Sequence, residues 1–69
     1  MQEFSLSQSE YIELCSLLKV TGLCESGAVA KSVISNGEVV VDGKVETRKR
    51  CKIKKDQIVL YNSESVKVV

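Results

Sequence analysis

The sequence predicts an α+β domain in which two helices pack against a small, mainly antiparallel sheet. Apolar residues recur at helical spacing in the first half of the chain, β-branched runs replace them after residue 38, and Asp42-Gly43 joins two of these runs. The expected order is one strand, two helices and four strands. A chain of 69 residues has room for one domain, residues 1–69, with a single core.

The first strand and the first helix are expected near the N-terminus. Phe4 and Leu6 alternate with polar residues, as in a short half-buried strand. Ser7 and Glu10 have the spacing of a capping box, so the first helix is expected to begin there. Gly22 is expected to end this helix. The apolar face of this helix consists of Tyr11, Leu14, Cys15 and Leu18.

A second, shorter helix is expected to begin after Ser26, which is a good N-cap residue. Ala30, Val33 and Ile34 supply its buried stripe, and Asn36-Gly37 ends it because both residues tolerate the left-handed conformation. About ten residues of helix are marginal alone, so this helix should depend on tight packing against a neighbour.

From residue 38 onwards the pattern is that of strands. The runs on either side of Asp42-Gly43 are β-branched, and this dipeptide is the strongest short hairpin signal. Residues 57–61 and 65–69 read as two further strands that turn at Asn62-Ser63.

Six of the ten basic residues lie within the eight positions from 48 to 55, although the net charge of the chain is only +1. If Cys51 and Ile53 face the core, strand alternation turns Arg50, Lys52 and Lys54 outward. Such a run can be a charged strand that resists aggregation, or one side of a binding surface. The six residues are Arg48, Lys49, Arg50, Lys52, Lys54 and Lys55.

The spacing of these features resembles the S4 RNA-binding domain, or αL motif, and the length resembles the small stand-alone bacterial members. Most S4 domains carry an arginine directly after the serine that opens the second helix, whereas this chain has Gly27. Lys55-Asp56 replaces the usual Gly-Asp before the penultimate strand. The matching positions are Leu14, Leu18, Gly22, Ser26, Ala30, Val33-Ile34, Gly37, Val39, Val41, Asp42-Gly43, Val45, Ile53, Asp56 and Ile58.

The resemblance implies that the protein binds structured RNA, such as ribosomal RNA, transfer RNA or structured mRNA. It would act as a monomer, and its partners could include the ribosome or an RNA-processing enzyme. In the S4 arrangement the helix pair and the basic segment share one surface. We therefore expect RNA contacts from Lys19, Lys31, Arg48, Lys49 and Lys52, with Arg50 in second rank and Lys44, Lys54 and Lys55 at the periphery.

The few aromatic residues and the shared charges both limit what the sequence says about the ligand. The only aromatic residues, Phe4, Tyr11 and Tyr61, are expected in the core, which favours recognition of RNA shape and backbone over stacking on unpaired bases. The alternative is a protein-interaction module or regulatory subunit that uses the same basic segment to bind an acidic protein partner. Composition does not separate the two hypotheses.

An enzyme, a metal site and a cofactor are not expected. The chain has no histidine, the commonest general base near neutral pH, and its three cysteines form no C-x-x-C pair. Cys15 and Cys51 are expected in the core, and Cys24, in the loop between the helices, is the only candidate for a reactive thiol. We see no secretory signal and no apolar run long enough for a membrane span, so we expect a cytoplasmic protein.

Overall fold

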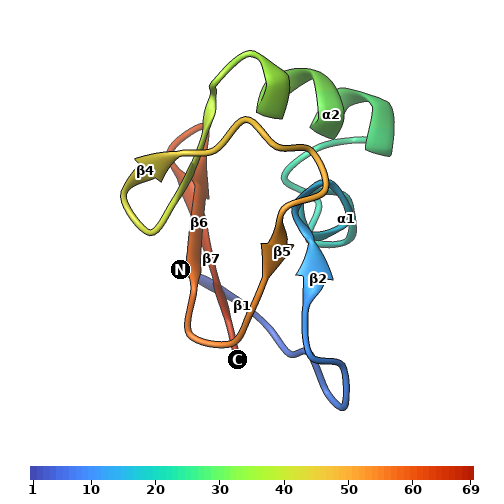
Figure 1. Cartoon of the computed structure of the whole chain (residues 1–69), viewed down its shortest axis with the longest axis vertical. Helices are drawn as coiled ribbons and strands as arrows, with labels where there is room; N and C mark the ends of the chain where they lie inside the picture. The colour runs from blue at the N-terminus through green and yellow to red at the C-terminus, as the bar shows by residue number, and fades with distance from the viewer.

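A computed structural model describes residues 1–69 and confirms the α+β class, with two helices on a mainly antiparallel sheet (Figure 1). Neither helix is long and apolar enough to cross a membrane. The elements are β1 (Gln2–Phe4), β2 (Ile12–Glu13), α1 (Leu14–Val20), α2 (Gly27–Ser35), β3 (Val39–Val41), β4 (Lys44–Val45), β5 (Lys52–Ile53), β6 (Ile58–Tyr61) and β7 (Glu64–Val68).

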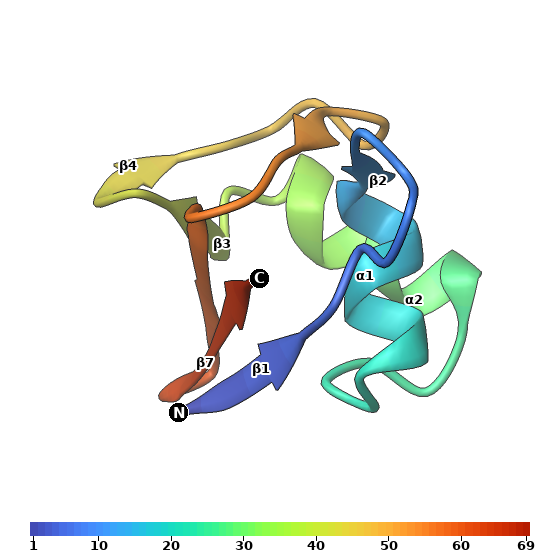
Figure 2. The same cartoon turned by 90° about the horizontal axis from the view of Figure 1, so that it is seen from below.

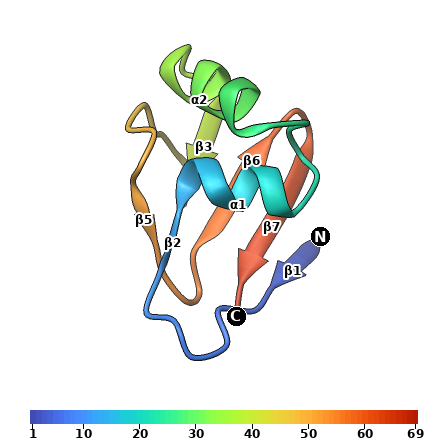
Figure 3. The same cartoon turned by 90° about the vertical axis from the view of Figure 1, so that its right-hand side faces the viewer.

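The strands form two sheets, not the single sheet that the sequence predicted. The main sheet has the order β1-β7-β6-β3-β4, and every pair in it is antiparallel except β1 with β7. The second sheet pairs β2 with β5, in the register Ile12↔Ile53 and Glu13↔Lys52. The strand in the basic stretch therefore pairs beside the helices and not with the main sheet (Figures 1 and 3).

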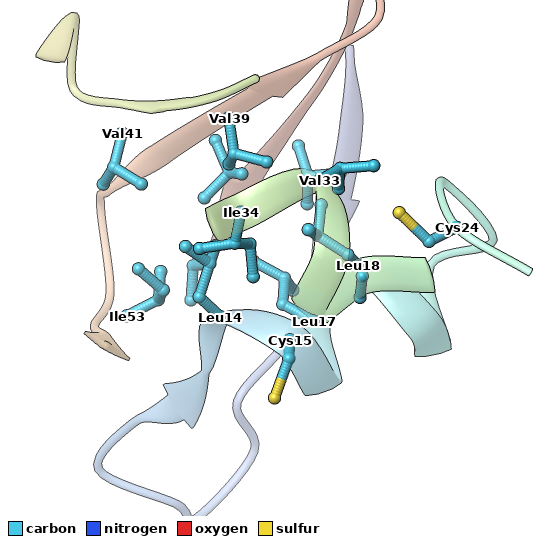
Figure 4. Packing of buried hydrophobic residues seen from close by; sticks show 14 of the residues in the cluster. Leu14, Cys15, Leu17, Leu18, Cys24, Val33, Ile34, Val39, Val41 and Ile53 are labelled. Carbon is cyan, nitrogen blue, oxygen red and sulfur yellow. The ribbon is translucent and has the colours of Figure 1, made fainter. Parts of the chain in front are cut away.

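Both helices lie on one face of the main sheet, and the core fills the space between the two layers (Figure 2). Leu14, Leu17, Leu18 and Ile34 of the helices are fully buried against the valines of β3, β6 and β7 (Figure 4). Ile53 of β5 is fully buried in the same cluster. The basic stretch is thus anchored to the core by Ile53, and Cys51 packs against the edge of the same cluster.

The first helix begins at Leu14, seven positions after the predicted cap at Ser7, so this prediction was wrong. Ser7 lies in a turn with φ 58°, and the residues just before the helix pair with β5 instead. Tyr11 consequently lies outside the helix and is 39% exposed, which corrects its expected place in the core. Phe4 and Tyr61 do pack against the core, as predicted.

The second helix has the predicted boundaries. The Ser26 hydroxyl accepts a hydrogen bond from the N–H of Val29 at 3.2 Å, which is the expected N-cap. At the other end, Gly37 has φ 77° and donates to the carbonyl of Ile34, while Glu38 donates to the carbonyl of Val33, both at 3.0 Å. This pair of hydrogen bonds is a Schellman motif, for which glycine is the favoured residue.

The two strand turns are also at the predicted dipeptides. Asp42 and Gly43 have φ of 51° and 84°, and Asn62 and Ser63 have φ of 52° and 65°. Two consecutive residues with positive φ make type I′ turns, whose twist suits an antiparallel hairpin.

The cysteines follow the prediction only in part. Cys15 is buried, as expected, and Cys51 is half-buried and packs against the core. Cys24, the candidate for a reactive thiol, is only 4% exposed, which disfavours that role. Its N–H donates to the carbonyl of Leu18 at 3.0 Å, which folds the loop back onto α1, and burial raises the pKa of its thiol, with a further contribution from Glu38.

Leu17→Ala should lower the free energy of unfolding by about 2–5 kcal/mol, because Leu17 is fully buried and the substitution leaves a cavity between helix and sheet. Urea denaturation would measure this. Val20→Ala, on the same helix but 59% exposed, should cost far less. Equal losses in the two variants would contradict the packing described above.

Candidate nucleic-acid interface

Residues 46–51, which we call the basic loop, close the N-terminus of α1. Glu13, the N-cap residue of α1, makes no side-chain capping bond. Instead, the N–H of Leu14 donates to the carbonyl of Cys51 at 2.9 Å, and the N–H of Cys15 donates to that of Lys49 at 3.1 Å. N–H groups in the first turn of a helix need such external acceptors. The basic loop is therefore fixed against α1 by its own backbone.

Glu46 organises the start of the basic loop. Its carboxylate accepts hydrogen bonds from the Nε of Arg48 at 2.8 Å, from a terminal nitrogen of Arg48 at 3.0 Å and from the backbone N–H of Arg48 at 3.0 Å. The side-chain bonds from Arg48, followed by the backbone bond, lower the pKa of Glu46 to about 2. Arg48 is already engaged, although 76% of its side chain is exposed.

Arg50 and Lys52 reach the segment before α1. The Nε of Arg50 donates to Oε2 of Glu13 at 3.1 Å, and the side chain of Arg50 remains 77% exposed. The Nζ of Lys52 lies 5.0 Å from the centre of the Tyr11 ring, within the range of a cation–π interaction. The pairing of β2 with β5 brings these groups together.

Two open hollows lie on either side of Arg50. The first, which we call the interhelix hollow, has a volume of about 380 Å³ and is lined by Glu13, Cys15, Ser16, Lys19, Gly27, Lys31 and Arg50. The second has a volume of about 510 Å³ and is lined by Arg48, Arg50, Cys51, Lys52 and Lys54. Since Arg50 lines both, the positive charges of the helices and of the basic loop form one continuous surface.

Comparison with known proteins decides the family. The family model of the S4 domain matches residues 4–69. The chain belongs to the S4 domain family. It is 55% identical over 69 residues to "Putative RNA-binding protein YbcJ" of Escherichia coli (strain K12), and this match covers 100% of the chain and 99% of the relative. An uncharacterised YbcJ of Shigella flexneri matches to the same extent.

Solved structures agree with this membership of the S4 family. The solution structure of YbcJ from E. coli, described as revealing an αL motif involved in RNA-binding, matches with a TM-score of 0.78 at 55% identity and covers 100% of this chain and 87% of that one. The 30S ribosomal protein S4e from Thermoplasma acidophilum matches with a TM-score of 0.70 at 25% identity, over 84% of this chain and 31% of that one. The predicted resemblance is confirmed.

All six basic residues predicted to contact RNA have exposed side chains, and five of them line the two hollows. Lys19, Lys31 and Arg50 meet around the interhelix hollow, and Arg50, predicted in second rank, lines both hollows. Arg48 and Lys52 line the second hollow, whereas Lys49 lines neither. Of the residues predicted as peripheral, Lys54 joins the second hollow, and Lys44 and Lys55 lie outside both.

Sequence reasoning missed the two carboxylates of this surface, Glu13 and Glu46. Glu46 is two residues before Arg48, a spacing that is visible in the sequence. Glu13 is 37 positions from Arg50, and only the fold brings them together. Each arginine of the surface thus already contacts one carboxylate.

The hydrogen bonds between Glu46 and Arg48 in the basic loop should be lost at acid pH. A lowered pKa means that the interaction is fully present above the ordinary value of 4.5 and is lost as the pH falls through about 2. The chemical shift of the Arg48 amide, followed by NMR from pH 6 down to about pH 1, should therefore change with a midpoint near 2. Glu46→Gln should abolish this transition, and a wild-type midpoint near 4.5 would contradict the contact.

Proposed function

We propose that the protein binds the sugar–phosphate backbone of structured RNA, without catalysis, through one basic surface. The observation that carries the proposal is the position of Arg50, which joins the charges of the helices to those of the basic loop. The names of the S4 relatives, which mention RNA-binding, support the same ligand. The surface consists of Lys19, Lys31, Arg48, Lys49, Arg50 and Lys52.

The shape of the surface favours structured RNA. Double-helical RNA presents regularly spaced phosphates and 2′-hydroxyl groups, whereas its deep major groove is closed to side chains. Two open hollows with basic rims suit contact with several phosphates on a convex backbone. Tyr11 is the only aromatic side chain with a large exposed fraction, and Lys52 lies over its ring. Stacking on successive unpaired bases needs several such rings.

Rigidity adds to this argument. Lys19 and Lys31 stand on helices, and the basic loop is held to α1 by two backbone hydrogen bonds. Side chains on a fixed backbone lose less conformational freedom on binding. Ribosomal RNA, transfer RNA and structured mRNA all have suitable backbones, so we include each as a target class, alone or beside the ribosome or an RNA-processing enzyme.

The triple variant Lys19→Gln, Lys31→Gln and Arg50→Gln should bind a labelled RNA hairpin at least tenfold more weakly than the wild type. Loss of phosphate contacts should also reduce the slope of log affinity against log salt by about 2, since each phosphate neutralised contributes roughly 0.7–0.9. Fluorescence anisotropy across a series of salt concentrations would measure both quantities.

The matched control removes the same charge elsewhere, with Lys44→Gln, Lys55→Gln and Lys67→Gln. These lysines lie outside both hollows, and β4, which carries Lys44, is on the side of the molecule away from α1 (Figures 1 and 2). Equal weakening in both triple variants would contradict the assignment of the surface.

A competition experiment separates RNA from protein as the ligand. If a polyanionic peptide competes as well as the hairpin, the ligand is an acidic protein. If no structured RNA binds at low salt, the proposal fails.

Gly27 stands where most S4 domains carry arginine. Gly27 and Arg50 line the same hollow, and a Cβ at Gly27 would meet nothing within 4 Å. Arg50→Ala should weaken RNA binding, and adding Gly27→Arg should restore much of the loss by supplying a guanidinium from α2. Anisotropy titrations of the single and double variants would show this rescue.

Ala28→Arg in the Arg50→Ala background is the control for that rescue. Ala28 is the next residue of α2, is exposed and does not line the hollow, so it adds the same charge in another direction. If Ala28→Arg restores binding as well as Gly27→Arg does, net charge matters and the interhelix hollow does not.

A further inference from the structure

We infer that the carboxylate of Glu13 occupies, in the free protein, the position at Arg50 that an RNA phosphate takes in the complex. Glu13 would then be a residue that limits the affinity of the surface. This inference rests on the proposed function and adds to it an acidic group that competes with the ligand for the central arginine.

The geometry of the pair supports a competition. Arg50 is the only arginine that lines the interhelix hollow, and its Nε donates to Oε2 of Glu13 at 3.1 Å. Glu13 lines the same hollow, together with Lys19 and Lys31. Carboxylate and phosphate oxygens accept from the same planar guanidinium fork. A phosphate that approaches Arg50 within the hollow therefore meets a negative charge already in contact with it.

Glu13 cannot leave this neighbourhood, because its backbone is fixed. It pairs with Lys52 across the β2–β5 ladder and is the N-cap residue of α1. Its side chain, in contrast, is bound only to Arg50, and about a third of it is exposed. The carboxylate can thus rotate away without a change in the loop backbone, but its charge stays beside the hollow.

Glu46 does not have this role, although it also contacts an arginine. Its carboxylate accepts from the backbone N–H of Arg48 as well as from the guanidinium, and its side chain is only 17% exposed. Removal of Glu46 would alter the shape of the basic loop. Glu13 is therefore the carboxylate whose charge can be tested without a change in loop structure.

Ion pairs at the protein surface are weak, so the Glu13–Arg50 pair can open at little cost when RNA binds. A backbone with several phosphates can contact Lys19 and Lys31 while one phosphate replaces the carboxylate at Arg50. The remaining cost is the repulsion between Glu13 and the bound phosphates. It should be largest at low salt, where screening is weakest.

The test is Glu13→Gln in the full-length protein with the same labelled RNA hairpin. Glutamine keeps an oxygen acceptor for the Nε of Arg50 but removes the charge. We expect affinity at low salt to rise about three- to tenfold and the salt slope to steepen by roughly 0.7–0.9, the value of one additional phosphate neutralised. Glu10→Gln removes the same charge from the same segment, where Glu10 is exposed and contacts no arginine, and should raise affinity less than twofold.

Arg50→Gln supplies the decisive background. The gain from Glu13→Gln should shrink to the size of the Glu10→Gln gain when Arg50 is already glutamine, because only the general repulsion between Glu13 and the bound phosphates then remains. A gain of undiminished size in the Arg50→Gln background overturns the inference but not the proposed RNA binding. A gain in the wild-type background that only equals the gain of Glu10→Gln does the same. Weaker binding of Glu13→Gln would show that the carboxylate positions Arg50 for RNA, which also overturns it. Absence of hairpin binding by the wild type would refute the proposed function and the inference with it.

Discussion

The capping of α1 by the basic loop is the interaction on which the candidate surface depends. Two backbone hydrogen bonds, from Leu14 and Cys15 to the carbonyls of Cys51 and Lys49, satisfy N–H groups that no side chain of the helix reaches. The same bonds hold the most charged part of the chain beside the helix pair. Helix stability and the presentation of the charges are therefore coupled, since neither the helix end nor the loop is complete alone.

The features that sequence could predict are those with local causes. Ser26 caps α2 and Gly37 ends it, each through hydrogen bonds within a few residues, and Asp42-Gly43 makes the hairpin turn through its own positive φ angles. The start of α1 has a distant cause. The capping-box pattern at Ser7 is a valid local preference, but Ile12 and Glu13, directly before α1, form a strand because Ile12 pairs with Ile53. A pairing across 41 positions leaves no sign in the spacing of either segment alone.

The contrast between local and distant causes also explains which features of the candidate site were predictable. The types of residue were predictable, because a cluster of lysine and arginine at S4 spacing indicates a polyanion. Their arrangement around the two hollows was not predictable. Strand alternation shows that Arg50 points outward, but not that it reaches the hollow between the helices. Arg48 ranked high on its position in the loop, yet its guanidinium is engaged by Glu46. Only the fold shows which charges are free and which are paired.

A net charge of +1 is compatible with binding a polyanion because the charges are sorted by position. On the proposed surface the arginines contact carboxylates, whereas Lys19 and Lys31 make no ion pair. The free lysines can attract phosphates at a distance. The paired arginines can add directional hydrogen bonds, but only to a ligand that displaces the carboxylate from the guanidinium or binds the guanidinium together with it. A ligand with one phosphate gains little from such an exchange. A backbone that places several phosphates over both hollows gains at each position, so mixed charge on this surface favours extended, regularly spaced anions over isolated ones.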